Sequence, residues 1–401
     1  AMVYIRGHAS DYDHWESLGN QGWSYSALLP YFKRSENNAD IQNEYHGQNG
    51  PLSVSNLQTE NPFHGIYLNA AKQAGFKINP DFNGADQEGV GIYQVTHQNG
   101  ERCSAARAYL HPHMGKRDNL HVETGVTVSK IIFQGKKAVA VEYLQNGQKH
   151  TVKANKEVIL CAGAFQSPQL LMLSGVGPAQ HLKEHGIEVL HDLPGVGQNL
   201  QDHPDFIFSY KAKSLDLVGI SLAGTVKMTG QIIRYIKERK GMIATNFAEG
   251  GGFLKTDEAL NAPDVQLHFV ISVVEDHARK LHFSHGYSCH VCLLRPQSRG
   301  QVTLKNNNPN SAPLIDPAFL KEEADLETLV KGYKLTKKLL DAPALADIRQ
   351  SDMVTAHIQT DDEIKQILRD RVDTVYHPVG TCKMGIDSMA VVDPELRVHG
   401  L

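Results

Sequence analysis

Residues 375–385, VYHPVGTCKMG, place a titratable histidine on constrained backbone. Pro378 follows His377, and its ring fixes φ and removes a backbone donor. Gly380 and Gly385 allow a tight turn or a close approach to a flat partner. An imidazole titrates near neutral pH, so His377 is suited to accept or polarise a proton. For this motif taken alone, a structural loop with an incidental histidine is the more common interpretation, and the rest of the sequence must decide between the two.

The cysteines are the other reactive side chains. Cys289 and Cys292 form a C-x-x-C pair inside GYSCHVCLLR, a segment that predicts a β-strand. Residues three apart on a strand point to opposite faces, so these thiols cannot easily share a metal or a disulfide. No second C-x-x-C or H-x-x-H completes a zinc site. We therefore predict no metal and an odd, sparse set of free thiols: Cys103, Cys161, Cys289, Cys292 and Cys382.

Glycine-rich turns that could hold a phosphate are present but incomplete. The G-x-G pairs at 89–91, 175–177 and 195–197 lack a third glycine at the dinucleotide-binding offset. No P-loop and no G-x-S-x-G elbow occurs. The segment 157–177, EVILCAGAFQSPQLLMLSGVG, is more informative because it predicts a buried strand over 157–161 that turns into a helix through Ala-Gly-Ala. Small residues at the end of a strand permit a ligand to approach closely.

The bulk properties are those of a globular protein without a nucleic-acid surface. The 401 residues carry a net charge of −4 with both signs mixed, and no apolar run approaches the ~20 residues of a membrane span. Helical patterns cover about 20–38, 61–76 and 215–243. Alternating patterns predict four strands over 119–161 and three more over 265–305. This order indicates an α+β architecture with two interleaved domains.

The segment 163–177, GAFQSPQLLMLSGVG, closely resembles a signature of the glucose-methanol-choline (GMC) flavoprotein oxidoreductases. The resemblance extends in family order over nearly the whole chain, through NGERCSAARAYL, LPGVGQNLQDH, AEGGGF, RPQSRGQVTL, YHPVGTCKMG and VVDPELRVHG. Choline dehydrogenases and FAD-dependent aliphatic alcohol dehydrogenases are the nearest group. Within that group, residues 273–300 look more like the aliphatic alcohol enzymes.

The resemblance implies an α+β fold: an α/β remnant of the flavin domain plus a substrate domain with an antiparallel sheet and surface helices. We expect residues 1–36 to be an intermediate segment of the FAD domain, and 37–99 and 202–376 to form the substrate domain. Residues 100–201 would be the middle of the FAD domain, with a three-stranded meander and the strand at 157–161. Residues 377–401 would carry the catalytic loop and begin a return to the FAD domain.

The resemblance also implies roles for two ionisable side chains. His377 matches the family histidine that faces the reactive edge of the flavin, which supports an acid–base role. Glu249 matches a position where choline-oxidising relatives offer a carboxylate to the trimethylammonium group, although a structural glutamate is an equal alternative. Asn199 and Asp202, in the turn before residue 203, are expected to be structural.

Cofactor contacts follow from the same comparison. Ala1, Met2 and Val3 follow the family's flavin-contacting loop and are expected near the isoalloxazine. The backbone of Val128 is expected to meet the adenine. Ala162 and Gly163 are expected on the side of the diphosphate.

The two ends of the sequence suggest a fragment. The family begins with a glycine-rich ADP-binding unit and ends with a segment carrying a second catalytic residue, and neither is seen here. We therefore expect this chain alone to bind FAD weakly or not at all and to be inactive. We also expect it to expose apolar surface around 158–164 and 2–5, which would favour self-association.

The expected function of the parent protein is FAD-dependent oxidation of a primary alcohol to an aldehyde, with a small alcohol and an electron acceptor, for example a quinone, as partners. Choline dehydrogenase is the alternative within the class, and a non-catalytic substrate-binding module without flavin is the alternative outside it. We predict a cytoplasmic protein and leave a peripheral contact with the inner membrane open. No nucleic-acid partner is expected.

Overall fold

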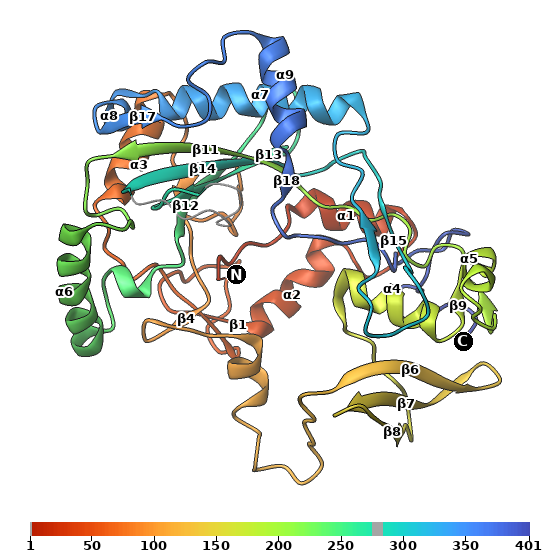
Figure 1. Ribbon diagram of the computed structural model, residues 1–401. Coiled ribbons are helices and arrows are strands. Elements are labelled where there is room, and N and C mark those ends of the chain that lie inside the picture. The colour runs from red at the N-terminus through yellow and green to blue at the C-terminus, as the bar shows by residue number, and fades with distance from the viewer. Residues whose placement is uncertain (1, 275–283) are drawn as a thin grey trace.

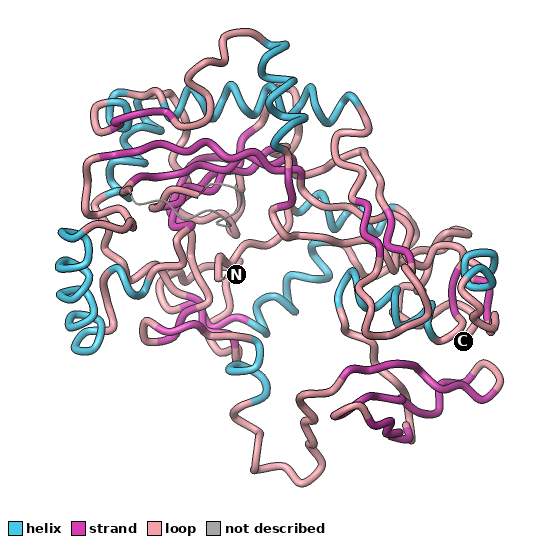
Figure 2. The backbone as a smooth tube through the Cα atoms, in the orientation of Figure 1, coloured by secondary structure: helices cyan, strands magenta, loops and turns pink. Residues whose placement is uncertain are grey.

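The computed structural model describes residues 2–274 and 284–401 and has the predicted α+β architecture. Helices surround a large antiparallel sheet, and a smaller lobe carries a separate meander (Figure 1). The helices are α1 (Ala9–Ser17), α2 (Tyr25–Ser35), α3 (Phe63–Gln73), the π-helix η1 (Ala106–Leu110), α4 (Gly163–Leu173), α5 (Ala179–Glu184), α6 (Leu222–Glu238), the 3₁₀ helix η2 (Met242–Ala244), α7 (Glu323–Leu340), α8 (Pro343–Ala346) and α9 (Asp361–Arg371). Long loops join these elements (Figure 2).

The large sheet joins strands from two distant parts of the sequence. Its order is β17-β11-β14-β13-β12-β3, with β18 also paired to β11, and every pairing is antiparallel. Its strands are β3 (Gly89–Ile92), β11 (Pro204–Ala212), β12 (Ala248–Leu254), β13 (Val265–Val270), β14 (Gly286–Leu293), β17 (Arg349–Asp352) and β18 (Asp373–Thr374). The antiparallel sheet expected from the 266–305 region is therefore confirmed. The sheet also brings β3 beside strands that lie more than 150 residues later.

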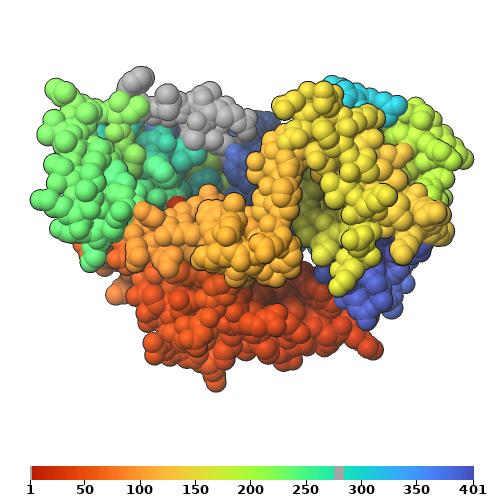
Figure 3. Space-filling model, turned by 90° about the horizontal axis from the view of Figure 1, so that it is seen from below, coloured from red at the N-terminus to blue at the C-terminus, as the bar shows by residue number. Residues whose placement is uncertain are grey.

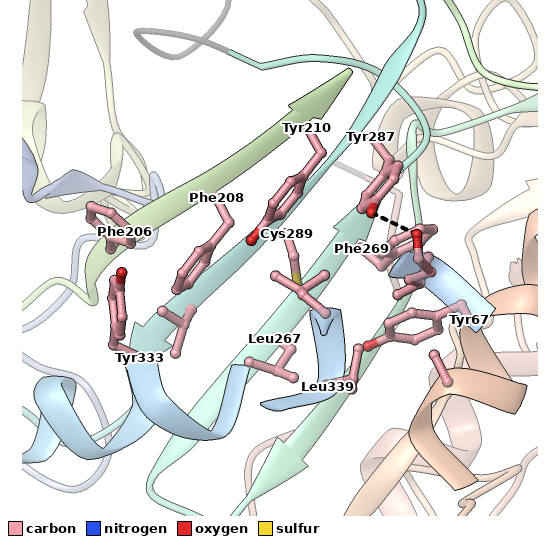
Figure 4. Packing of buried hydrophobic residues seen from close by; sticks show 14 of the residues in the cluster. Tyr67, Phe206, Phe208, Tyr210, Leu267, Phe269, Tyr287, Cys289, Tyr333 and Leu339 are labelled. Carbon is pink, nitrogen blue, oxygen red and sulfur yellow. Dashed lines mark hydrogen bonds between the residues drawn. The ribbon is translucent and has the colours of Figure 1, made fainter. Parts of the chain in front are cut away.

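One face of this sheet packs against helices and forms the main core. Aromatic side chains from alternate strand positions interdigitate with residues of α3 and α7 (Figure 4). The rings of Tyr67 and Phe269 stack with centroids 4.4 Å apart, and Phe208 lies 4.7 Å from Tyr333. Such pairs add to the free energy gained by burying apolar area. The alternation leaves the opposite face of each strand free for polar side chains.

The C-x-x-C thiols lie on strand β14, as predicted. Both are buried, and burial raises the pKa of each thiol well above its ordinary value. Cys289 packs in the main core, while Cys292 is three residues further along the same strand. Across the described part of the chain, no group of three or more His, Cys, Asp or Glu side chains is arranged to hold a metal ion.

The smaller lobe contains the meander of β6 (Thr127–Gln134), β7 (Lys137–Gln145) and β8 (Gln148–Lys153), which confirms the three-stranded prediction. A hollow separates this lobe from the side of the molecule that carries α6 (Figure 3). Short pairings complete the structure: β1 (Glu36–Asn38) with β2 (Leu52–Val54), β4 (His97–Gln98) with β5 (Glu101–Arg102), β9 (Val176–Gly177) with β10 (His191–Asp192), and β15 (Gln301–Thr303) with β16 (Leu314–Asp316).

The prediction of a buried strand over 157–161 is wrong. The segment is irregular in the structure, and Ile159 is 74% exposed. Apolar residues favour a strand only where a neighbouring strand can satisfy the backbone groups, and no described strand pairs with this segment. The exposed apolar surface expected around 158–164 is thus present at Ile159, whereas residues 2–5 are half-buried.

Candidate functional site

The loop that carries His377 is held by the turn at 193–203. Gln201 and Val379 exchange backbone hydrogen bonds of 2.9 and 2.8 Å, and the Asn199 side chain donates to the carbonyl of Gly380 at 3.1 Å. On the other side, the Thr381 hydroxyl donates to the Ala164 carbonyl in the first turn of α4 at 2.5 Å. Two segments far apart in the sequence therefore fix the backbone on which the histidine stands.

Gly380 is required by this arrangement. Its φ is +96°, and a Cβ built there would lie 2.3 Å from the Asn199 carbonyl oxygen. A side chain would therefore meet both an unfavourable backbone conformation and a rigid backbone atom. Gly380 therefore has two roles. It allows the His377 loop to turn, and it allows that loop to pack closely against the 193–203 segment.

Replacing Gly380 with alanine is expected to destabilise the protein by ~1–2 kcal/mol more than a glycine replacement that adds only strain. Gly147 supplies the matched control because its φ is +78° and a Cβ there meets no atom within 4 Å. Urea unfolding of Gly380→Ala and Gly147→Ala measures the difference. Equal losses of stability in the two variants would contradict the clash.

His377 lies at the surface of the loop that the 193–203 turn and α4 hold in place, and Asp202 fixes its backbone. The N–H of His377 donates to Asp202 Oδ1 at 3.0 Å, and Asp202 also accepts from the Thr374 hydroxyl. Part of the side chain is exposed to solvent. The surrounding protein still removes enough water to lower the pKa of His377, although the charges of Asp202 and Asp205 oppose the change. The imidazole is therefore a neutral base near pH 7.

The ring of His377 belongs to a cluster of four histidines. It meets His203 edge to face at 5.7 Å and His268 at 6.5 Å, and His268 lies 6.0 Å from His290. Nδ1 of His290 is 2.6 Å from a carboxylate oxygen of Asp205. The cluster thus extends from the exposed His377 into the polar face of the large sheet.

Burial sets the protonation of the inner rings. Desolvation, followed by the neighbouring His377, lowers the pKa of His203 to about 4. Desolvation also holds the pKa of His268 well below its ordinary value. Nδ1 of each of these rings is buried without a hydrogen-bond partner in residues 2–274 and 284–401. An unpaired buried nitrogen is costly, which indicates that a polar group of a ligand or water completes this region.

Sequence reasoning missed His203, His268 and His290. The available signal was strand alternation: His268 and His290 occupy paired positions on β13 and β14, between residues of the apolar core. The expected structural roles of Asn199 and Asp202 agree with their hydrogen bonds to the His377 loop.

The N-terminal residues approach the same cluster. Ala1 lies outside the described residues. The carbonyl of Met2 accepts from the Thr96 N–H at 2.8 Å, and Val3 packs against the aromatic group that includes Tyr93. The Tyr93 ring is 6.0 Å from His268. Tyr93 therefore connects the segment expected beside the isoalloxazine with His268 of the histidine cluster.

The other expected cofactor contacts lie in the smaller lobe and at its junction with α4. Val128 is exposed on β6 and pairs with Tyr143 of β7. Ala162 and Gly163 are exposed where α4 begins, and a Cβ on Gly163 would meet nothing within 4 Å. Because Thr381 bonds to Ala164, this helix start is directly joined to the His377 loop.

Glu249 occupies a different position. It lies on β12 at a register shift and is fully buried. Its carboxylate oxygens are 2.7 Å from His64 Nε2 of α3 and accept from the Thr245 hydroxyl at 2.7 Å. The described contacts join the Glu249 carboxylate to α3 and to the segment before β12. Its backbone carbonyl accepts from the N–H of Tyr93 at 3.0 Å, and the ring of Tyr93 is 6.0 Å from His268.

Comparison with known proteins places this geometry in a family. Models described as GMC oxidoreductase match residues 1–205 and 296–401. The chain is 44% identical to alcohol dehydrogenase (acceptor) of Pseudomonas putida, covering 100% of this chain and 73% of that protein, and 43% identical to mitochondrial choline dehydrogenase of Homo sapiens, covering 100% and 68%. An arginine-to-lysine variant of formate oxidase from Aspergillus oryzae, solved in a study of how the mutation affects FAD modification, superposes with a TM-score of 0.90 at 25% identity, covering 100% of this chain and 76% of that one. The chain belongs to the GMC oxidoreductase family.

Proposed function

We propose that this chain is the major part of an FAD-dependent dehydrogenase that oxidises a primary alcohol to an aldehyde, with His377 as the acid–base group. The observation that carries the proposal is the His377 loop. Its backbone is clamped by the 193–203 turn and by α4, while its imidazole faces solvent with a lowered pKa. A positioned neutral base is what removal of a hydroxyl proton requires.

The residues present fit FAD. The unpaired buried Nδ1 atoms of His203 and His268 lie in the histidine cluster that includes His377, where a polar group of the cofactor could pair with them. The exposed backbone at Ala162 and Gly163 is unobstructed, as close approach to a diphosphate needs. Met2, Val3, Ala162 and Gly163 would hold the cofactor, with Val128 meeting the adenine.

Bound FAD would supply a hydride acceptor at N5, and the protein would position the reacting groups and supply the electrostatic field around them. His377 takes the hydroxyl proton as the C–H bond gives up its hydride, so one alcohol yields one aldehyde, and two electrons leave with the hydride. Asp202 keeps the histidine backbone in place. We propose that a quinone is the separate acceptor that would take up these two electrons.

The pH dependence of the reaction follows from the direction of the shift. A histidine with a lowered pKa is neutral above that pKa, so kcat/KM should be constant near neutrality and fall as the pH drops. The midpoint should lie below ~6.5, the ordinary value. Asp202→Asn should move it lower still, because the Asp202 charge raises the pKa of His377. A midpoint that rises in this variant would contradict the assignment.

Choline is a second candidate substrate. Its support is the similarity to choline dehydrogenases at 41–43% identity, and we propose Glu249 on β12 as the carboxylate that would meet the ammonium group. Steady-state kinetics with choline, a medium-chain alcohol and an aryl alcohol, using a dye as acceptor, would rank the substrates. A preparation without flavin absorbance that still binds an alcohol would favour a non-catalytic binding module.

A further inference from the structure

Helix α6 presents an apolar stripe to solvent. Leu222, Val226, Ile233 and Ile236 are 86%, 69%, 51% and 69% exposed. At 100° per residue these four side chains fall on one side of the helix. None of the helix residues is buried. The helix stands at the outer edge of the molecule, beside the sheet rather than over it (Figure 1).

The opposite side of α6 is the one that contacts the protein, and it is the more polar side. Gln231 Oε1 accepts from the Met242 N–H at 3.0 Å, and the Tyr235 hydroxyl donates to the Gly100 carbonyl at 3.2 Å. Gly224 lies against the His285 ring. A helix on a globular protein ordinarily buries its apolar stripe and exposes its polar side. The orientation of α6 is the reverse, so its apolar stripe needs an external partner.

The segment that carries the stripe is basic, in contrast to the whole chain. Residues 222–240 contain five basic side chains, Lys227, Arg234, Lys237, Arg239 and Lys240, against one acidic side chain, Glu238. This gives a net charge of +4, whereas the chain carries −4. Ion pairs join four of these cations to Asp216, Glu60 and Glu101, and counting those three carboxylates leaves +1. The patch therefore stays cationic after its own pairs are included.

We propose that α6 is an interfacial anchor that lies in the plane of an anionic lipid bilayer. An outward apolar stripe on a helix that is otherwise rich in basic side chains is the composition of helices that bury one side at the headgroup boundary, and in α6 Lys237 lies next to the stripe. Basic side chains gain further free energy from anionic lipid. Among the described helices, none has the length and apolar content to cross a bilayer, so the contact would be peripheral.

A second copy of the chain fits the patch less well. Facing two α6 helices would bring two cationic patches together. A lipid surface needs no complementary shape and supplies the opposite charge.

Sedimentation with extruded vesicles tests the proposal on the purified protein. We expect binding to phosphatidylcholine vesicles that contain about 30% phosphatidylglycerol, and weaker binding to pure phosphatidylcholine. Val226→Glu/Ile233→Glu should lower the partition coefficient about tenfold or more. Lys237→Glu should weaken binding to the anionic vesicles alone. Val152→Glu/Leu314→Glu, which changes exposed apolar residues outside α6, is the matched control and should bind normally.

Circular dichroism and melting temperature check that each variant is folded, and Val226→Gln/Ile233→Gln replaces the glutamates if they disturb the helix. Failure of the unmodified protein to bind either vesicle overturns the proposal. Equal loss in the α6 and control variants also overturns it. Light scattering adds a further outcome: a concentration-dependent dimer that the α6 variants abolish, without vesicle binding, would assign the stripe to a second copy.

Discussion

Replacing His377 with alanine should lower turnover of the intact enzyme by about 100-fold or more. The variant loses the imidazole that accepts the hydroxyl proton, while the backbone bonds from Asp202, Gln201 and Thr381 remain available. Folding should change little because the side chain is partly exposed. Pre-steady-state reduction of the flavin by alcohol, followed at its absorbance maximum, measures the chemical step directly.

The matched control for this variant is His121→Ala, which removes an exposed histidine paired with Glu123 outside the histidine cluster. It should retain full activity. Flavin content and melting temperature of both variants must match those of the unmodified protein. Turnover near the normal rate in His377→Ala would end the acid–base assignment while leaving the family membership intact.

Glu249→Gln should weaken the binding of choline by about 1–3 kcal/mol if the carboxylate meets the quaternary ammonium group. A medium-chain alcohol carries no charge and should be indifferent to the change. The glutamine can keep hydrogen bonds to His64 and Thr245, so it removes the charge with little loss of volume. The ratio of kcat/KM for the two substrates isolates the charge effect.

Glu88→Gln serves as the control because Glu88 pairs with Lys255 at the surface. It should leave the ratio unchanged, since screened surface pairs contribute little. A loss of equal size for choline and the uncharged alcohol in Glu249→Gln would assign Glu249 to structure. That outcome would fit its complete burial and its two close partners.

Local patterns predicted the elements well where each strand has a partner nearby in sequence. Alternating residues over 127–153 form the meander, and those of β13 and β14 pair in the sheet. The segment 157–161 has similar apolar content but no described partner strand, so composition alone misled the prediction. A segment forms a strand only when another segment pairs with it, and its own residues do not show whether that partner exists.

The site was predictable only in part for a related reason. His377 stands in a motif with distinctive neighbours, so one short segment was enough to indicate it. His203, His268 and His290 each look unremarkable locally, and they meet only because β13 pairs with β14 and the 193–203 turn reaches the His377 loop. The register between distant strands determines whether these histidines come together, and a short stretch of sequence does not show that register.

The buried thiols have a consequence for chemical durability. Cys382 is five residues from His377, close to where an electrophilic aldehyde would form, and burial raises its pKa to about 12. The thiol is therefore protonated at pH 7, and the thiolate is the form that attacks electrophiles. Cys289 and Cys292 are protected in the same way. Repeated turnover should therefore spare these three cysteines, and adducts of the product should collect first on the exposed Cys161.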